Sequence, residues 1–124
     1  MKAFLFLCTL IFLATGFNTL HGNVVFVKNG KPASKLVLSD NPTATAKYAA
    51  AELAKHIRMA TRVSLEIQSE SEVTKENISR IYIGETKAAR RFGIDANSLP
   101  REAFMMRSVG NDLFIVGKED NGNP

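Results

Sequence analysis

The sequence predicts an α/β fold of the two-layer α+β kind, with a mixed sheet of about six strands, one long helix and one short helix. Three observations predict it. Several short runs are rich in β-branched residues or alternate apolar and polar ones, residues 43–60 carry apolar residues every three or four positions, and residues 80–92 pass from a strand through Gly84 into a helix. We expect the helices to pack mainly on one face of the sheet.

The first elements predicted are two strands joined by a tight turn. Residues 23–27 read as a strand, and Asn29 with Gly30 is a dipeptide that accepts the positive φ angles of a two-residue hairpin. The partner strand is predicted at 34–38, with Pro32 placed where an edge strand tolerates a missing N–H.

A long amphipathic helix should follow, with Thr43 as its N-cap. Its charged residues lie largely off one stripe, which predicts that the stripe packs on the sheet. His56 lies at the edge of the stripe and is interpreted as structural or solvated, because the other histidine, His21, belongs to the N-terminal segment. The stripe consists of Ala46, Ala49, Ala50, Leu53, Ile57 and Ala60.

The second half is predicted to alternate strands with one short helix. The polar loop at 68–77 carries three glutamates that we interpret as solvated, and the basic residues of the short helix as a solvated face. Consecutive Met105 and Met106 should fill opposite faces of a strand. The expected strands are 63–67, 80–84, 102–109 and 113–117, the last two antiparallel, and the helix is 85–92 with Gly93 as its stop; the glutamates are Glu70, Glu72 and Glu76, and the basic residues Lys87, Arg90 and Arg91.

The N-terminal segment predicts export. Lys2 precedes an apolar run at 3–14, which at about twelve residues suits a signal peptide and is shorter than the roughly 20 residues of a membrane span. Cleavage is expected after Gly16 or Gly22, and both sites stay open. The predicted organisation is therefore a signal peptide at 1–22, one domain at 23–120 and the start of a connection to a C-terminal region at 121–124. The expected location is secreted or periplasmic, with no stable membrane anchor.

Composition narrows the possible chemistry. The net charge is +4, and the basic residues are spread among acidic ones, so we expect no nucleic-acid partner. The single cysteine, Cys8, lies in the predicted signal peptide, which leaves the exported chain without disulfides or thiolate metal sites. Glycine at position 84 alone is far weaker than a phosphate-binding fingerprint, and no cofactor or metal site is expected.

Acidic residues beside turns and strand ends are the candidates for acid and base chemistry. Glycoside hydrolysis uses two carboxyl groups about 5 to 9.5 Å apart, and no such pair can be assigned from spacing. We interpret these acids as structural and assign no catalytic, cofactor-binding or metal-binding residue. They are Asp40, Glu85, Glu102, Glu119 and Asp120.

Four landmarks occur in order: VKNGKP at 27–32, YAAAEL at 48–53, IYIG at 81–84 and FIVGKED at 114–120. Together they resemble the N-terminal α/β domain of bacterial α-glucuronidase-like proteins, which is related to the non-catalytic domain before the barrel in β-N-acetylhexosaminidases. The resemblance covers residues 23–120. One departure is Thr61 and Arg62, where such domains often have a glycine after the helix.

The resemblance implies a β-hexosaminidase domain-2-like fold and a non-catalytic accessory domain of an exported glycoside hydrolase, such as an α-glucuronidase in xylan-type polysaccharide breakdown. In that family a following (β/α) barrel carries the catalytic carboxylates, so the implied partner is the barrel of the same polypeptide, with polysaccharide as a further one. The alternative is a free-standing secreted module that binds glycan or protein without enzymatic activity. Such glycan modules use flat aromatic platforms; this sequence has no Trp, and Tyr48 and Tyr82 are expected to be packed.

Overall fold

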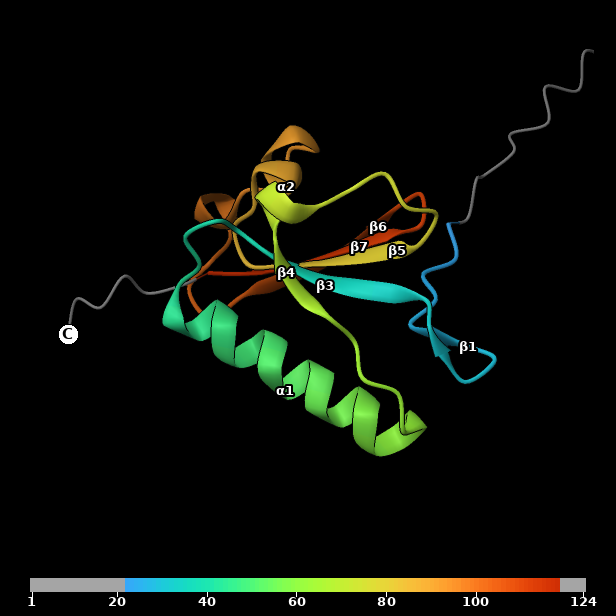
Figure 1. Cartoon of the computed structure of the whole chain (residues 1–124). Helices are drawn as coiled ribbons and strands as arrows, with labels where there is room; N and C mark the ends of the chain where they lie inside the picture. The colour runs from blue at the N-terminus through green and yellow to red at the C-terminus, as the bar shows by residue number, and fades with distance from the viewer. Residues whose placement is uncertain (1–21, 119–124) are drawn as a thin grey trace, which may run out of the picture.

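The computed structural model describes residues 22–118. A five-stranded mixed sheet with strand order β4-β3-β5-β7-β6 forms the centre, and a small two-stranded hairpin lies at one end (Figure 1). The α/β fold class, with one long and one short helix, is confirmed. The elements are β1 Val27–Lys28, β2 Lys31–Pro32, β3 Ser34–Leu38, α1 Ala44–Thr61, β4 Ile67–Ser69, the 3₁₀ segment η1 Glu70–Glu72, β5 Ser79–Ile83, α2 Lys87–Arg91, the 3₁₀ segment η2 Ala96–Ser98, β6 Phe104–Val109 and β7 Asp112–Gly117.

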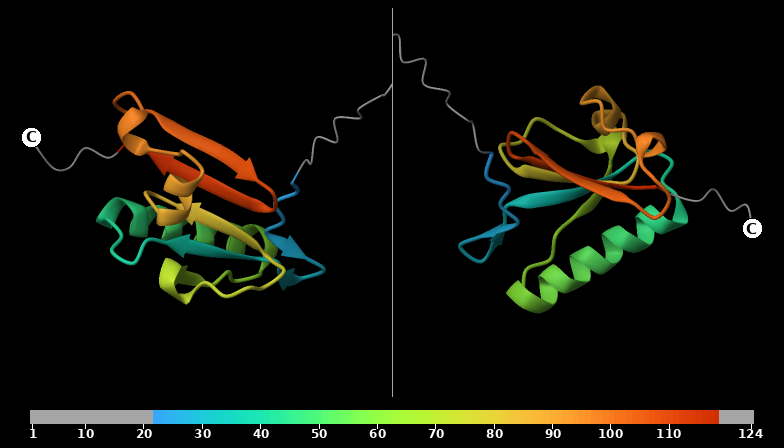
Figure 2. Two further views of the ribbon diagram at one scale, coloured as in Figure 1. Left: turned by 90° about the horizontal axis from the view of Figure 1, so that it is seen from above. Right: turned by 180° about the vertical axis from the view of Figure 1, so that it is seen from behind.

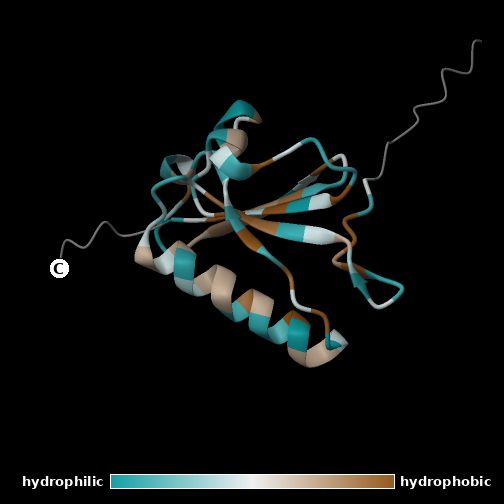
Figure 3. Cartoon of the chain, in the orientation of Figure 1, coloured by the Kyte–Doolittle hydropathy of each residue, from teal (hydrophilic) through white to brown (hydrophobic). Residues whose placement is uncertain are grey.

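The two central strands, β3 and β5, bury both of their faces. Successive side chains of a strand point to opposite faces, so Leu36 and Ile81 pack toward α1 while Val37 and Tyr82 pack on the other side. Tyr82 stacks on Phe114 of β7, with ring centroids 4.8 Å apart and planes 6° from parallel. Figure 3 shows hydrophobic residues along these strands. The core therefore has two parts, one on each face.

Helix α1 begins as predicted, because the Thr43 hydroxyl accepts a hydrogen bond of 3.1 Å from the Ala46 N–H. The predicted stripe is correct for most of its members. Ala49 and Ala60 are exposed, however, since Ala49 lies about 100° around the helix from Ala50 and Ala60 falls in the last turn, beyond the last packed residue. The residues that meet the sheet are Ala46, Ala50, Leu53, Ala54 and Ile57.

His56 is exposed, and its Nε2 lies 3.6 Å from a carboxylate oxygen of Glu52 on the same helix. This agrees with the solvated interpretation of the residue.

The short helix α2 packs on the face opposite to α1. Its Ala89 is fully buried in the cluster of Val37, Tyr82 and Phe114. Helices had been expected mainly on one face of the sheet, and the long helix meets that expectation while the short one does not. The reason is that β3 and β5 present apolar residues on both faces, so both need cover.

The strand predicted at 63–67 was wrong in its extent. Residues 63–66 form no ladder; Leu65 is buried beneath α1, and β4 pairs with β3 only from Ile67 onward. The predicted loop at 68–77 therefore starts as strand and continues as η1. The strand begins later than predicted because the parallel register pairs Leu36 with Ile67 and Leu38 with Ser69.

The first hairpin is shorter than predicted. Asn29 and Gly30 form the expected turn, with φ of 52° and 69°. Its strands are only β1 and β2, and the predicted second strand, 34–38, instead enters the central sheet as β3 between β4 and β5.

The C-terminal hairpin of β6 and β7 is antiparallel as predicted. Met105 packs against the cluster on the α2 face, whereas Met106 is 58% exposed. The prediction that both methionines fill apolar surfaces is thus right for one of them.

Replacing Arg62 with glycine should stabilise the domain. Arg62 caps α1 in the left-handed region with φ of 65°, and its N–H donates to the Arg58 carbonyl at 2.8 Å. A non-glycine residue is strained there, and the relief exceeds the extra chain entropy of glycine, so we expect R62G to raise the free energy of unfolding by about 0.5 to 1 kcal/mol. Urea unfolding measures this. Arg58→Gly, inside the helix, should instead lower it by about 1 kcal/mol, and a destabilised R62G would contradict the expectation.

Candidate functional site

The strand order creates a place where chain connections diverge. From β3 the chain passes through α1 to β4 on one side, and from the neighbouring β5 it passes through α2 to β6 and β7 on the other. In open α/β sheets, ligands bind outside the carboxyl ends of the strands at such a topological switch point. The end of the sheet where β3 and β5 finish is therefore the first place to look for a site.

A cavity of about 520 Å³ lies at this end. The start of α1 and the orange segment near residue 100 lie at the same end of the sheet (Figure 1). The cavity lies at the ends of the four parallel strands, β4, β3, β5 and β7, and the loops that follow these strands line it. Its lining is Ser39, Asp40, Asn41, Pro42, Thr43, Ala46, Glu70, Ile83, Glu85, Lys87, Arg90, Ala96, Asn97 and Lys118.

Asp40 joins three segments at the rim of the cavity. One carboxylate oxygen accepts from the Ser71 N–H at 2.8 Å, and the other pairs with Lys87 Nζ at 3.0 Å. The hydrogen bond from Lys87, followed by those from Ser71, lowers the pKa of Asp40 below its ordinary value. Asp40 therefore stays a carboxylate at neutral pH.

Glu70 binds the first N–H groups of the short helix α2, whose N-cap is Thr86. Its two carboxylate oxygens accept from the backbone N–H groups of Lys87 and Ala88, each at 2.9 Å. A phosphate bound at the start of α2 would need these same amides, so the Glu70 carboxylate occupies the place of such a phosphate. Gly84 itself has φ of 80°, and a Cβ there would lie 3.0 Å from the Ala46 Cβ. The glycine thus permits close approach of α1 to the end of β5.

Two charged side chains of the lining remain unengaged. The Glu85 carboxylate and the Arg90 guanidinium make no hydrogen bond or ion pair with any residue in 22–118. Lys118 Nζ donates only a long hydrogen bond of 3.4 Å, to the Asn97 carbonyl. The cavity therefore presents polar groups that a ligand could use.

The structure brings two of the acidic candidates together and separates the others. Asp40 and Glu85 line the same cavity. Glu102 lies outside its lining, in a turn with φ of 63° before β6. Glu119 and Asp120 lie outside the described residues. No pattern in the sequence indicated the cavity, because its lining comes from loops that only the sheet topology brings together.

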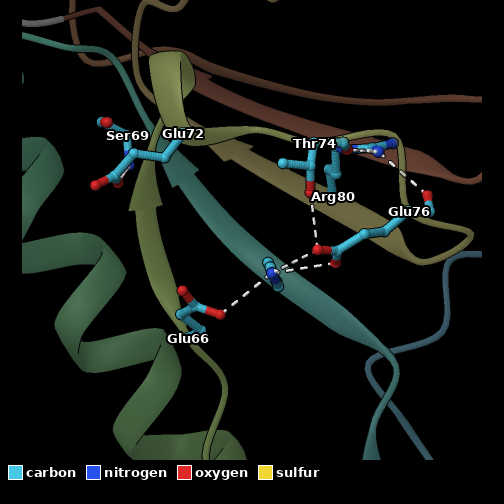
Figure 4. Close-up of polar contacts among 7 residues, drawn as sticks. Glu66, Ser69, Glu72, Thr74, Glu76 and Arg80 are labelled. Carbon is cyan, nitrogen blue, oxygen red and sulfur yellow. Dashed lines mark hydrogen bonds and ion pairs between the residues drawn. The ribbon is translucent and has the colours of Figure 1, made fainter.

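Of the three glutamates of 68–77, Glu72 and Glu76 are exposed, as the solvated interpretation expected, and all three also accept hydrogen bonds or form ion pairs. Glu76 lies 3.1 Å from Lys35 Nζ, which also pairs with Glu66 at 3.3 Å (Figure 4), and Glu72 accepts from the Ser69 N–H at 2.8 Å. The pKa of Glu76 is lowered, first by the Thr74 hydroxyl and then by Lys35. Within 22–118, no group of three or more His, Cys, Asp or Glu residues is placed so that it could hold a metal ion.

A second surface lies on β6 and β7, on the side of the sheet that carries α1. Viewed from above, α1 lies beneath β3 and β5, and the β6–β7 hairpin extends past it (Figure 2). Phe104 is 70% exposed there, Met106 is 58% exposed, and Leu113 and Ile115 are partly buried beside them. We call these four residues the β6–β7 face. The apolar residues at alternate positions 104 and 106 could have indicated this face from the sequence. The sequence could not show that α1 would leave the face uncovered.

The fold and cavity define a mixed α/β domain with a polar crevice at the switch point of its sheet. Comparisons with models of protein families, with curated proteins and with solved structures found no match to this chain. None of the helices within 22–118 is long and apolar enough to cross a membrane.

The Asp40 contacts should stabilise the domain only above acidic pH. Because the folded-state pKa is lowered, the stabilisation is present above the ordinary value of 3.8 and is lost as the pH falls through the lower folded value. We expect Asp40→Asn to lower the melting temperature at about pH 7 and to match the wild type near about pH 2. Melting curves across this range measure the difference. A gap that persists in acid would show that charge is not the cause.

Proposed function

We propose that this chain is a non-catalytic accessory domain of an exported carbohydrate-active enzyme, and that it packs against the catalytic barrel of the same polypeptide. The four sequence landmarks and their resemblance to the domain of α-glucuronidase-like proteins motivate the proposal, which includes export through the segment 1–22. A role in xylan-type polysaccharide breakdown belongs to the same proposal.

The observation that carries the proposal is the β6–β7 face. Large apolar side chains that stay exposed in adjacent positions are typical of surfaces that meet another protein surface. Phe104 and Met106 alternate along an edge strand, so they form one patch with Leu113 and Ile115 rather than scattered contacts. A neighbouring domain laid on this face would complete the cover that α1 gives to the other half of the sheet.

The acidic residues of the cavity support a non-catalytic role. A glycosidase needs one carboxyl group that keeps its proton at neutral pH and a second one across the scissile bond. Lys87 and Ser71 hold Asp40 as a carboxylate, and both oxygens of Glu70 already accept hydrogen bonds from the amides of α2. Glu85 alone is left on the lining without such a partner.

One observation favours the alternative, a free-standing module that binds glycan. Tyr48 was expected to be packed, yet it is 69% exposed on α1. Tyr82, by contrast, is 8% exposed and stacked on Phe114, so it offers no platform. The other exposed rings within 22–118, Phe92 and Phe104, lie on other elements than Tyr48. The accessory role remains our proposal.

The chain by itself should hydrolyse no glycoside. We expect purified residues 23–124 to release neither glucuronic acid nor N-acetylglucosamine from aryl glycosides, because the cavity lacks a paired acid and nucleophile. Release that Glu85→Gln abolishes would overturn the proposal.

The proposal also expects the reading frame to continue past Pro124 into a barrel-length sequence, and a stop codon there would favour the free-standing alternative.

Polar substitutions on the β6–β7 face should leave the isolated domain stable. Because Phe104 and Met106 are exposed, F104S and M106S should each change the free energy of unfolding by no more than about 0.5 kcal/mol. Phe114→Ala is the matched control on the neighbouring strand: its ring is buried, and its loss should cost about 3 to 5 kcal/mol. Chemical unfolding distinguishes the cases. Unfolding by F104S would mean that the face belongs to the domain's own core.

A further inference from the structure

We propose that the cavity beyond β3 and β5 binds a small hydroxylated anion of about monosaccharide size, a sugar acid or a sugar phosphate. The inference rests on the position and lining of the cavity. It holds whether or not the domain packs against a barrel, so the two proposals can fail separately.

The position is the first step. The cavity lies at the switch point, where the loops after β3 and β5 lead to helices on opposite faces of the sheet. Its volume of about 520 Å³ is within the range of roughly 300 to 1,000 Å³ that holds small-molecule ligands. Segments far apart in sequence converge on it, from Ser39 to Lys118.

The charge of the lining is the second step. Asp40 is paired with Lys87, and the Glu70 carboxylate is satisfied by backbone amides. The charged groups that are not held by another side chain or by helix amides are Glu85, Arg90 and Lys118. Over the whole lining, three acidic and three basic side chains balance. Among them the Arg90 guanidinium, which pairs with no residue in 22–118, is the group that we expect to bind an anion. A guanidinium also binds carboxylate and phosphate oxygens in a bidentate manner.

The neutral part of the lining selects the rest of the ligand. Amides and hydroxyls both donate and accept hydrogen bonds, as sugar hydroxyls require, and the lining supplies Asn41, Asn97 and Ser39. No aromatic residue is among the lining side chains within 22–118, so a nucleobase would find no ring to stack on. A ligand rich in hydroxyls fits this surface better than a flat one.

The experiment is an NMR titration of the ¹⁵N-labelled chain in about 0.15 M salt, which screens weak surface attraction. The probes are gluconate, glucose 6-phosphate and neutral glucose, so that the first two separate a carboxylate from a phosphate ligand. We expect one of the anions to shift the amides of residues 39–41, 43 and 84–87 and to bind at least about tenfold more tightly than glucose.

Variants test the assignment of charge. Arg90→Ala should weaken binding of the anion about tenfold, and Glu85→Gln should leave it unchanged or tighter. The matched control is Arg91→Ala, which removes the same charge one position along α2, outside the cavity lining, and should change the dissociation constant by less than about twofold. Melting curves confirm that each variant is folded.

Three results would overturn the proposal. They are no shift at these loops with either anion up to about 10 mM, equal affinity for glucose and the anions, or equal weakening by R90A and R91A, which would indicate diffuse surface charge.

Discussion

Both faces of β3 and β5 are apolar, and most other features follow from the need to cover them. Leu36 and Ile81 require a layer on one side, which α1 supplies, while Val37 and Tyr82 require a layer on the other, which α2 supplies. The chain segments that follow these two neighbouring parallel strands run to helices on opposite faces, so they diverge at the carboxyl ends of the strands. The crevice there is therefore a consequence of burying the core.

Local hydrogen bonds then fix the loops that surround the crevice. Thr43 caps α1, Glu70 accepts from the first N–H groups of α2, and Asp40 connects the loop after β3 both to η1 and to Lys87. These side chains make their hydrogen bonds within the protein. The groups left over, among them Arg90, are the ones whose chemistry is available to a ligand.

Features set by neighbours in sequence could be predicted, and features set by distant pairing could not. Asn29 with Gly30 makes its turn and Thr43 its cap because backbone conformation there depends on a few adjacent residues. The extent of β4 depends instead on register with Leu36, about thirty residues earlier, and the role of Glu70 on a helix 17 residues later. The cavity is of this second kind, because distant segments form its lining. The sequence alone therefore could not predict that Glu85 and Arg90 line the same cavity.

The two edges of the sheet are protected differently, which bears on what covers the β6–β7 face. Strand β4 has three residues and ends directly in η1, so it offers little for another strand or surface to pair with. Strand β6 has six residues, and its one charged residue, Arg107, donates to the Phe92 carbonyl on the α2 side of the sheet. Its α1 side, with Phe104 and Met106, thus lacks the charges that usually keep an exposed edge from associating. A strand of this length and composition is better suited to being covered than to facing water, and the cavity, beyond the ends of β3 and β5, would stay separate from that contact.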